Sequence, residues 1–126
     1  AILIPKESYD NCFGYYIKYA MRNAMDIATI GCSVNVVLSA DKKTLQRVRI
    51  AYGVAGPVPS RARTAEAALN GMPVGEAAIA AIGEEVLKDV NPRTSWRATA
   101  EFRKQIISET ARRGLRAAIE RAGGVF

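Results

Sequence analysis

The 126-residue chain contains no histidine and only two cysteines, Cys12 and Cys32. Histidine is the usual general base near neutral pH and the commonest metal ligand, so its absence argues against a self-contained hydrolytic or metal-dependent enzyme. Two cysteines at this spacing form neither a disulfide framework nor a zinc site. We therefore expect no metal site in this chain and a reducing compartment, the cytoplasm, as its location.

Long apolar runs are also missing. No stretch reaches the roughly 18 consecutive apolar residues that cross a bilayer, and the opening letters AILIP are too short, and lack a basic flank, for a signal peptide. The sequence thus predicts a soluble protein without a membrane segment. Residues 1–4 read as a strand and no methionine precedes them, so we expect the chain to be a piece of a longer protein.

The common catalytic and nucleotide-binding motifs are absent. The chain has no G-x-G-x-x-G, no phosphate loop ending in G-K, no C-x-x-C, no H-E-x-x-H and no G-x-S-x-G. Residues 53–59, GVAGPVP, combine glycine with proline, but no helix start carrying a lysine follows them. A crossing loop between two elements is the better interpretation of this segment than a phosphate site.

Acidic residues are fewer than basic ones, 12 against 18, which gives a net charge of +6. Such an excess is typical of proteins that bind nucleic acid. Here, however, the cations are scattered, the C-terminal arginines alternate with glutamates, and no aromatic side chains alternate with the cations to stack bases. We expect no nucleic-acid partner, and keep a free-standing basic RNA-binding or protein-interaction module as the alternative function.

The pattern along the chain predicts strands first and helices afterwards. Three stretches rich in β-branched and aromatic residues read as strands joined by short turns, at residues 13–19, 27–38 and 45–52. Apolar residues at helical spacing then predict helices over residues 64–69, 76–90 and 96–122. The expected fold is α+β: a small three-stranded antiparallel sheet with one face covered by about three helices.

A domain boundary is expected close to the start of the chain. Pro5 ends the first apolar run, and a polar turn follows it. We assign residues 1–10 to the end of a preceding domain and its linker, and residues 11–126 to the α+β domain.

The last predicted helix begins after Thr94 and Ser95, either of which is a suitable N-cap. Its predicted buried stripe consists of small and apolar residues: Ala100, Ile107, Ala111, Leu115, Ala118 and Ala122. At the start of this helix we expect Trp96 to pack against the sheet and Glu101 to pair with Arg97 or Arg103.

Charged residues recur every fourth position in the otherwise apolar stretch 15–28, at Lys18, Arg22 and Asp26. Charges among apolar side chains need partners, because burying an unpaired charge is costly. Lys18 is suited to donate to an anionic or carbonyl-bearing ligand, whereas Arg22 and Asp26 are suited to hold the loop by pairing with each other or with the backbone. From the residues alone a structural turn is favoured over a ligand site.

Three motifs, which follow one another along the chain, favour a ligand site over a structural turn. They are K-x-x-x-R-x-x-x-D-I-A from Lys18, Y-G-V-A-G-P at residues 52–57 and S-W-R-A-x-x-E-F-R at residues 95–103. With the sequence around them, which covers nearly the whole chain, they resemble the C-terminal domain of the FAD-binding subunit of molybdenum hydroxylases, the CO dehydrogenase flavoprotein C-terminal domain family. Among these proteins the resemblance is strongest to bacterial xanthine dehydrogenases.

The resemblance implies that this domain closes one side of a flavin cleft. The FAD is then held mostly by the FAD-binding domain of the same subunit, while Lys18, Tyr19 and Arg22 contribute cofactor contacts and no residue of this chain is catalytic. The loop at residues 19–29 is expected beside the flavin ring, where nearby charge tunes its chemistry.

The resemblance further implies a multisubunit oxidoreductase. The expected partners are a molybdopterin-binding subunit and an iron-sulfur subunit with 2Fe-2S clusters. Together they would oxidise a purine and pass electrons through the clusters and FAD to NAD, and the isolated chain is expected to be inactive.

Overall fold

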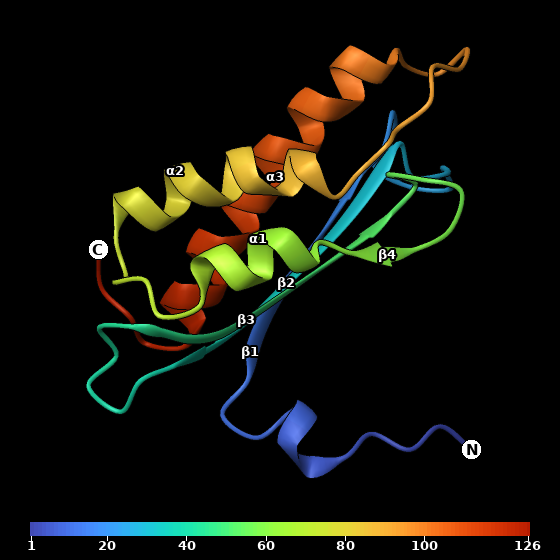
Figure 1. Ribbon diagram of the computed structural model, residues 1–126. Helices are drawn as coiled ribbons and strands as arrows, with labels where there is room; N and C mark the ends of the chain where they lie inside the picture. The colour runs from blue at the N-terminus through green and yellow to red at the C-terminus, as the bar shows by residue number, and fades with distance from the viewer.

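The computed structural model describes all residues 1–126, and it is an α+β fold in which one antiparallel sheet carries helices on a single side (Figure 1). The strands lie in the order β1-β2-β3-β4. Their bounds are β1 Phe13–Tyr19, β2 Ile30–Leu38, β3 Leu45–Gly53 and β4 Ser60–Arg61. The helices are α1 Arg63–Leu69, α2 Glu76–Glu85 and α3 Ala100–Arg121, with short 3-10 turns η1 at Lys6–Ser8 and η2 at Val86–Lys88.

Alternation along the strands decides which face the helices cover. In β2 every second side chain from Ile30 onward is buried, and the register places Cys32 between Ile17 of β1 and Tyr52 of β3. Side chains two apart point to the same face of a sheet. The apolar set of all three long strands therefore faces one side, where it meets the helices.

Helix α3 provides the apolar stripe that covers this face. Ile107, Ala111, Leu115 and Ala118 are fully buried, as the sequence predicts, and α3 lies against β1 and β2. Gly114 allows the close approach, because a Cβ atom there would lie 2.9 Å from a methyl carbon of Val34. Helix α1 packs on β3, and α2 packs on α1 and α3 (Figure 1).

Two arginines of α3 bind backbone carbonyls, one in the loop just before β2 and one in β1. Arg103, near the start of the helix, donates from Nη1 to the carbonyl oxygen of Thr29 at 2.6 Å. Arg121, in its last turn, donates from Nη1 to the carbonyl oxygen of Gly14 at 2.9 Å, and its guanidinium lies over the ring of Tyr15. Helix α3 is thus tied to the sheet at both ends.

The opposite face of the sheet has no helix over it (Figure 1). Tyr16 and Lys18 of β1 point to this open face, since they alternate with the helix-facing residues. The N-terminal segment runs on the same side, where Arg47 of β3 donates to the carbonyl oxygen of Glu7 at 2.8 Å. The boundary expected between residues 1–10 and 11–126 stays a prediction.

The expected architecture is confirmed with one correction, because the sheet has four strands and not three. The additional strand β4 has two residues, of which Arg61 pairs with Ala51 of β3. It lies directly after the predicted crossing loop of residues 53–59, and two residues are too few to show alternation. Strand β2 also begins at Ile30 and not at residue 27, because the backbone of Thr29 closes a loop by donating to Tyr19 at 2.8 Å.

The helix starts and ends also differ from the expectation. Helix α2 ends at Glu85, before the predicted end at residue 90, and the chain continues as the 3-10 turn η2. Helix α3 begins at Ala100 and not at Trp96, because the hydroxyl of Thr99 accepts from the backbone of Phe102 at 3.1 Å and caps it. Thr94 accepts from Ala100 at 3.0 Å and supports the same turn.

Candidate functional site

The β1–β2 loop, residues 20–29, is built around Asp26. One carboxylate oxygen of Asp26 accepts from the backbone of Arg22 at 2.9 Å, and the other accepts from its own neighbour Ile27 at 2.9 Å. Although desolvation acts in the opposite direction, these backbone donors lower the pKa of Asp26 below its ordinary value. The carboxylate is therefore ionised at neutral pH and fixes the shape of the loop.

Both predicted cations bind the same loop through backbone carbonyls. Lys18 donates from Nζ to the carbonyl oxygen of Asp26 at 2.6 Å, and Arg22 donates from Nη2 to that of Met25 at 2.7 Å. Neither cation forms an ion pair with a carboxylate, although the charge of Arg22 helps to lower the pKa of Asp26. The expectation that Arg22 and Asp26 hold the loop is met by contacts that involve the backbone.

Large apolar side chains of the loop point into solvent beside these cations. Met25 has a positive φ of 50° and 94% of its surface exposed, and Met21 and Ile27 are exposed as well. An apolar surface next to cations that bind only backbone carbonyls suits a flat ligand that also carries polar or anionic oxygen atoms. The loop therefore has the properties of one wall of a cofactor site.

Tyr19, the third predicted site residue, is placed differently. It points to the helix face of the sheet, is half-buried and packs against Phe102 with ring centroids 6.1 Å apart. The structure thus brings Lys18 and Arg22 together at Asp26, whereas the Tyr19 side chain lies on the other face of β1.

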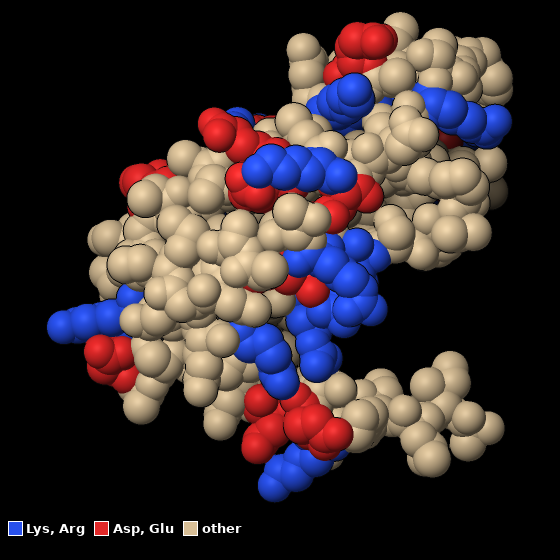
Figure 2. All heavy atoms as spheres, in the orientation of Figure 1, with Lys and Arg blue, Asp and Glu red and all other residues tan.

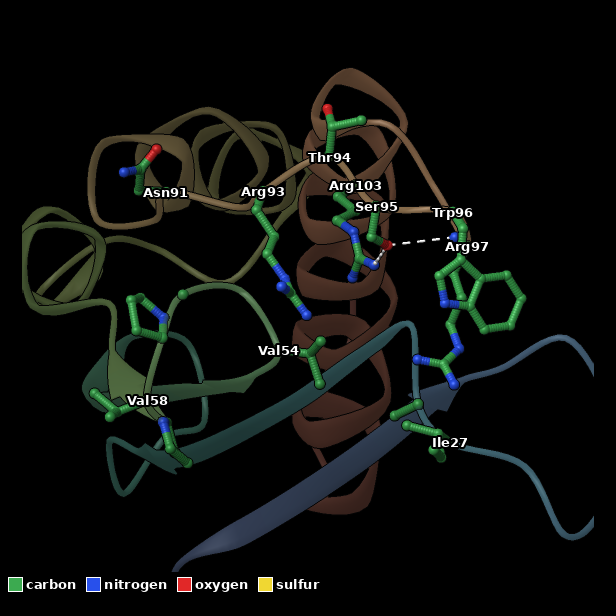
Figure 3. A pocket seen from close by; sticks show the side chains of 14 residues that line it. Ile27, Val54, Val58, Asn91, Arg93, Thr94, Ser95, Trp96, Arg97 and Arg103 are labelled. Atoms are coloured by element: carbon green, nitrogen blue, oxygen red, sulfur yellow. Dashed lines mark hydrogen bonds between the residues drawn. The ribbon is translucent and has the colours of Figure 1, made fainter.

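A second feature borders the loop at Ile27 and Ala28. It is a cleft of about 900 Å³ between the β3–β4 loop and the segment that leads into α3 (Figure 3). Three arginines line it: Arg93, Arg97 and Arg103. We call it the arginine cleft.

The cleft is not evident from the sequence, in which residues 95–103 read as a helix start. The packing expected for Trp96 is wrong, since 86% of its surface is exposed in the loop before α3. Glu101 also forms no ion pair with Arg97 or Arg103. The available signal was the spacing of Arg93 and Arg97, with no acidic residue between Asp89 and Glu101.

Arg103 is the buried member of the cleft, with 3% of its surface exposed. Its Nη2 donates to the hydroxyl of Ser95 at 3.0 Å, and its Nη1 donates to the carbonyl of Thr29. Its Nε is buried and has no partner. Burial, followed by the nearby charges of Arg93 and Arg97, lowers the pKa of Arg103.

The sequence identifies the class of protein to which this fold and loop belong. Residues 15–118 match the family model described as the CO dehydrogenase flavoprotein C-terminal domain. This match spans most of the chain and confirms the resemblance seen in the three motifs. The chain belongs to this family.

The relatives with similar sequences are more specific. The chain is 40% identical over 124 residues to a protein described as a putative xanthine dehydrogenase FAD-binding subunit of Escherichia coli K12. It is equally similar to the xanthine dehydrogenase FAD-binding subunit of Escherichia coli O157:H7. The match covers 98% of this chain and 42% of each relative, so the chain spans less than half the length of the relatives it matches.

Solved structures share the fold. A chain of carbon monoxide dehydrogenase from Hydrogenophaga pseudoflava superposes with a TM-score of 0.81 at 28% identity, over 89% of this chain and 38% of that one. Quinoline 2-oxidoreductase from Pseudomonas putida 86 gives a TM-score of 0.80 at 20% identity, over 88% and 38%, which shows the fold alone.

The surface gives no support to the alternative of a basic nucleic-acid module. On the face drawn in Figure 2, Lys and Arg side chains alternate with Asp and Glu over the helices. Two of the arginines of α3 are paired, Arg113 with Glu109 and Arg116 with Glu76, both at 2.7 Å. Separately, none of the helices has the length and apolar character needed to span a membrane.

Proposed function

We propose that this chain is the part of an FAD-binding oxidoreductase subunit that closes one side of the flavin site with its β1–β2 loop. The observation that carries the proposal is the pair of cations Lys18 and Arg22, held by the loop without a carboxylate partner. The family and the 40% identical FAD-binding subunits support the same assignment.

The residues present fit a flavin. Lys18 uses one of its three N–H donors on the carbonyl of Asp26, which leaves donors for the oxygen atoms of an isoalloxazine ring. The exposed thioethers of Met21 and Met25 offer a polarizable apolar surface to the same ring. FAD, when bound, supplies the electron acceptor and donor, and this chain's residues orient the ring and place positive charge near it.

The open face of the sheet is proposed to receive the FAD-binding domain of the same subunit. Lys18 points to this face, and residues 1–10 run on the same side. Tyr19, turned toward α3, supports the loop through its contact with Phe102 and is not proposed to touch the flavin through its ring.

The complex that contains this chain is proposed to oxidise a purine such as xanthine. In it, a molybdopterin-binding subunit and a 2Fe-2S iron-sulfur subunit are the proposed partners, and NAD is the proposed electron acceptor. The support is the name of the 40% identical relatives, and no purine pocket is assigned to this chain. Purine-dependent reduction of NAD by the assembled complex tests this assignment directly.

Lys18→Ala in the FAD-binding subunit that contains this chain tests the flavin proposal. We expect the flavin-to-protein ratio to fall or the flavin absorption band to shift, because a donor and a positive charge leave the ring. Purified subunits are compared by visible absorption, and the assembled complexes by the rate of purine-dependent NAD reduction. Lys104→Ala, which removes an exposed lysine of α3, is the matched control.

Far-UV circular dichroism shows whether both variants are folded. Native flavin content, an unchanged absorption band and an unchanged rate in a folded Lys18→Ala protein would refute the contact. Arg22→Gln is expected to change the flavin content and the absorption band in the same direction. Its effect on flavin binding should be weaker, because the guanidinium of Arg22 is also engaged in holding the loop through the carbonyl of Met25.

A further inference from the structure

The arginine cleft contains positive charge that nothing in the chain neutralises. Its 14 lining residues include three arginines and no aspartate or glutamate. None of the ion pairs in the structure involves Arg93, Arg97 or Arg103. Figure 3 shows Arg93 extending toward Val54 and Arg97 toward Ile27, with Arg103 between them.

The buried guanidinium of Arg103 points to a ligand. Both of its hydrogen-bond partners, the Thr29 carbonyl and the Ser95 hydroxyl, are neutral, and its Nε has none. A buried charge is normally compensated by an opposite charge, because desolvation without pairing is costly. Burial is the main cause of the lowered pKa of Arg103, and the charges of Arg93 and Arg97 add to it. An oxyanion in the cleft would supply the missing compensation.

The shape of the cleft favours a small molecule. Its volume of about 900 Å³ lies within the range of small-molecule pockets. Pro57 and Pro59 form part of one wall, and prolines restrict the backbone there. The cleft is too large for a single phosphate ion, so the oxyanion is expected to be part of a larger ligand.

The rim of the cleft offers an aromatic surface. Trp96 is exposed, and the guanidinium of Arg97 lies 4.4 Å from its ring centroid on one face. The other face of the indole is open for stacking, and indole rings stack well on nucleobases. Arginine is also the residue whose fork of donors matches phosphate oxygens.

From these observations we propose that the arginine cleft binds a nucleotide, with Arg93, Arg97 and Arg103 holding its phosphate groups and Trp96 stacking on its base. The proposal uses only residues of the cleft and requires no flavin. Its failure would therefore leave the proposed flavin contact of Lys18 untouched, and the reverse also holds.

The test is isothermal titration of the full chain, free of FAD, with three probes: ADP, pyrophosphate and adenosine. We expect ADP to bind at least tenfold more tightly than adenosine, because the phosphates carry the charge interaction. We also expect ADP to bind several-fold more tightly than pyrophosphate, because stacking on Trp96 adds to it.

Variants then assign the residues. Arg93→Gln combined with Arg97→Gln is expected to weaken ADP at least tenfold, and Trp96→Ala is expected to weaken ADP while leaving pyrophosphate unchanged. Arg63→Gln is the matched control, since Arg63 is an exposed arginine of α1 outside the cleft. These variants change the exposed Arg93 and Trp96 and the half-buried Arg97 and keep the buried Arg103, and circular dichroism checks their fold.

Several results would overturn the proposal. Equal affinity for ADP and pyrophosphate would refute the contact between the base and Trp96. If neither ADP nor pyrophosphate bound, the proposed site itself would be refuted. Binding of an acidic peptide such as hexaglutamate at least as tight as that of ADP would show that the cleft serves a protein partner. If Arg63→Gln lost as much ADP binding as the double variant, the effect would come from the net charge of the chain and not from the arginine cleft.

Discussion

Glu66 and Arg103 are both buried charged residues, yet the chain treats them in opposite ways. Glu66, in α1, accepts from the backbone of Ile50 at 2.9 Å and from Nε of Arg61 at 2.8 Å, and its second oxygen accepts from the same guanidinium. Arg103, in α3, binds only neutral oxygens and keeps one donor without a partner.

The difference separates a structural charge from a functional one. The carboxylate of Glu66 is compensated by groups of its own chain, so nothing outside is needed to explain it. The guanidinium of Arg103 lacks such compensation and lies in a cleft with two further arginines. Variants at each position can break or sharpen this contrast.

The largest effect is expected for Glu66→Ala. It leaves the buried N–H of Ile50 without an acceptor and removes the partner of Arg61, so the free energy of unfolding should fall by about 3 kcal/mol. Urea denaturation measures it. A loss below about 1 kcal/mol would mean that water replaces the carboxylate, and the contrast with Arg103 would then disappear.

A gain in stability is expected for Ser95→Asp. The hydroxyl of Ser95 lies 3.0 Å from Nη2 of Arg103, so a carboxylate there pairs with the buried guanidinium and should raise the free energy of unfolding by about 1.5 kcal/mol. The same change should weaken ADP binding to the arginine cleft at least tenfold, because the charge is then compensated internally. Ser95→Ala, which removes the hydroxyl, is the control; an aspartate variant less stable than this alanine variant would contradict the prediction.

Cys32 is a third buried ionisable group, and it remains neutral. Burial raises the pKa of its thiol to about 11, against 9.0 for a free thiol. A raised pKa in the folded state contributes stability that is complete below pH 9 and is lost as the pH rises toward 11. Between pH 8 and pH 10 the free energy of unfolding should therefore fall by about 1 kcal/mol more in the natural chain than in Cys32→Ala. Urea denaturation at the two pH values measures it, and equal losses would refute it.

The smallest effect is expected for Arg113→Ala, which removes an exposed pair with Glu109 at 2.7 Å on α3. Exposed ion pairs contribute little because water screens them, so the free energy of unfolding should change by less than about 0.5 kcal/mol. This variant sets the baseline for the other three. A loss comparable to that of Glu66→Ala would mean that burial is not what separates these charges.

Much of the fold is readable from the sequence because burial imposes a period on it. β1 begins at Phe13 and ends at Tyr19 as predicted, and the buried stripe of α3 is nearly complete. The sequence does not reveal β4, because a two-residue strand has no period and depends on the register with Ala51. It also places the start of α3 too early, because Thr94 and Ser95 are suitable N-caps in the sequence whereas the residue that caps the helix is Thr99.

The site is readable only in part. The spacing of Lys18, Arg22 and Asp26 predicts a loop held by charge, and the structure has that loop. The arginine cleft depends on bringing Arg93 and Arg103 together with Ile27, which is more than 60 positions away in the chain. No local pattern contains that information.

The two anchors of α3 have a consequence for how the chain can change in length. Arg103 and Arg121 are 18 positions apart, which is about five turns and about 27 Å at 3.6 residues and 1.5 Å per residue. They therefore emerge from the same side of the helix, and each reaches its own carbonyl, Arg103 that of Thr29 next to β2 and Arg121 that of Gly14 in β1. A one-residue insertion between them would rotate one anchor by about 100° and break it, whereas the turn at residues 40–44 should tolerate the same insertion.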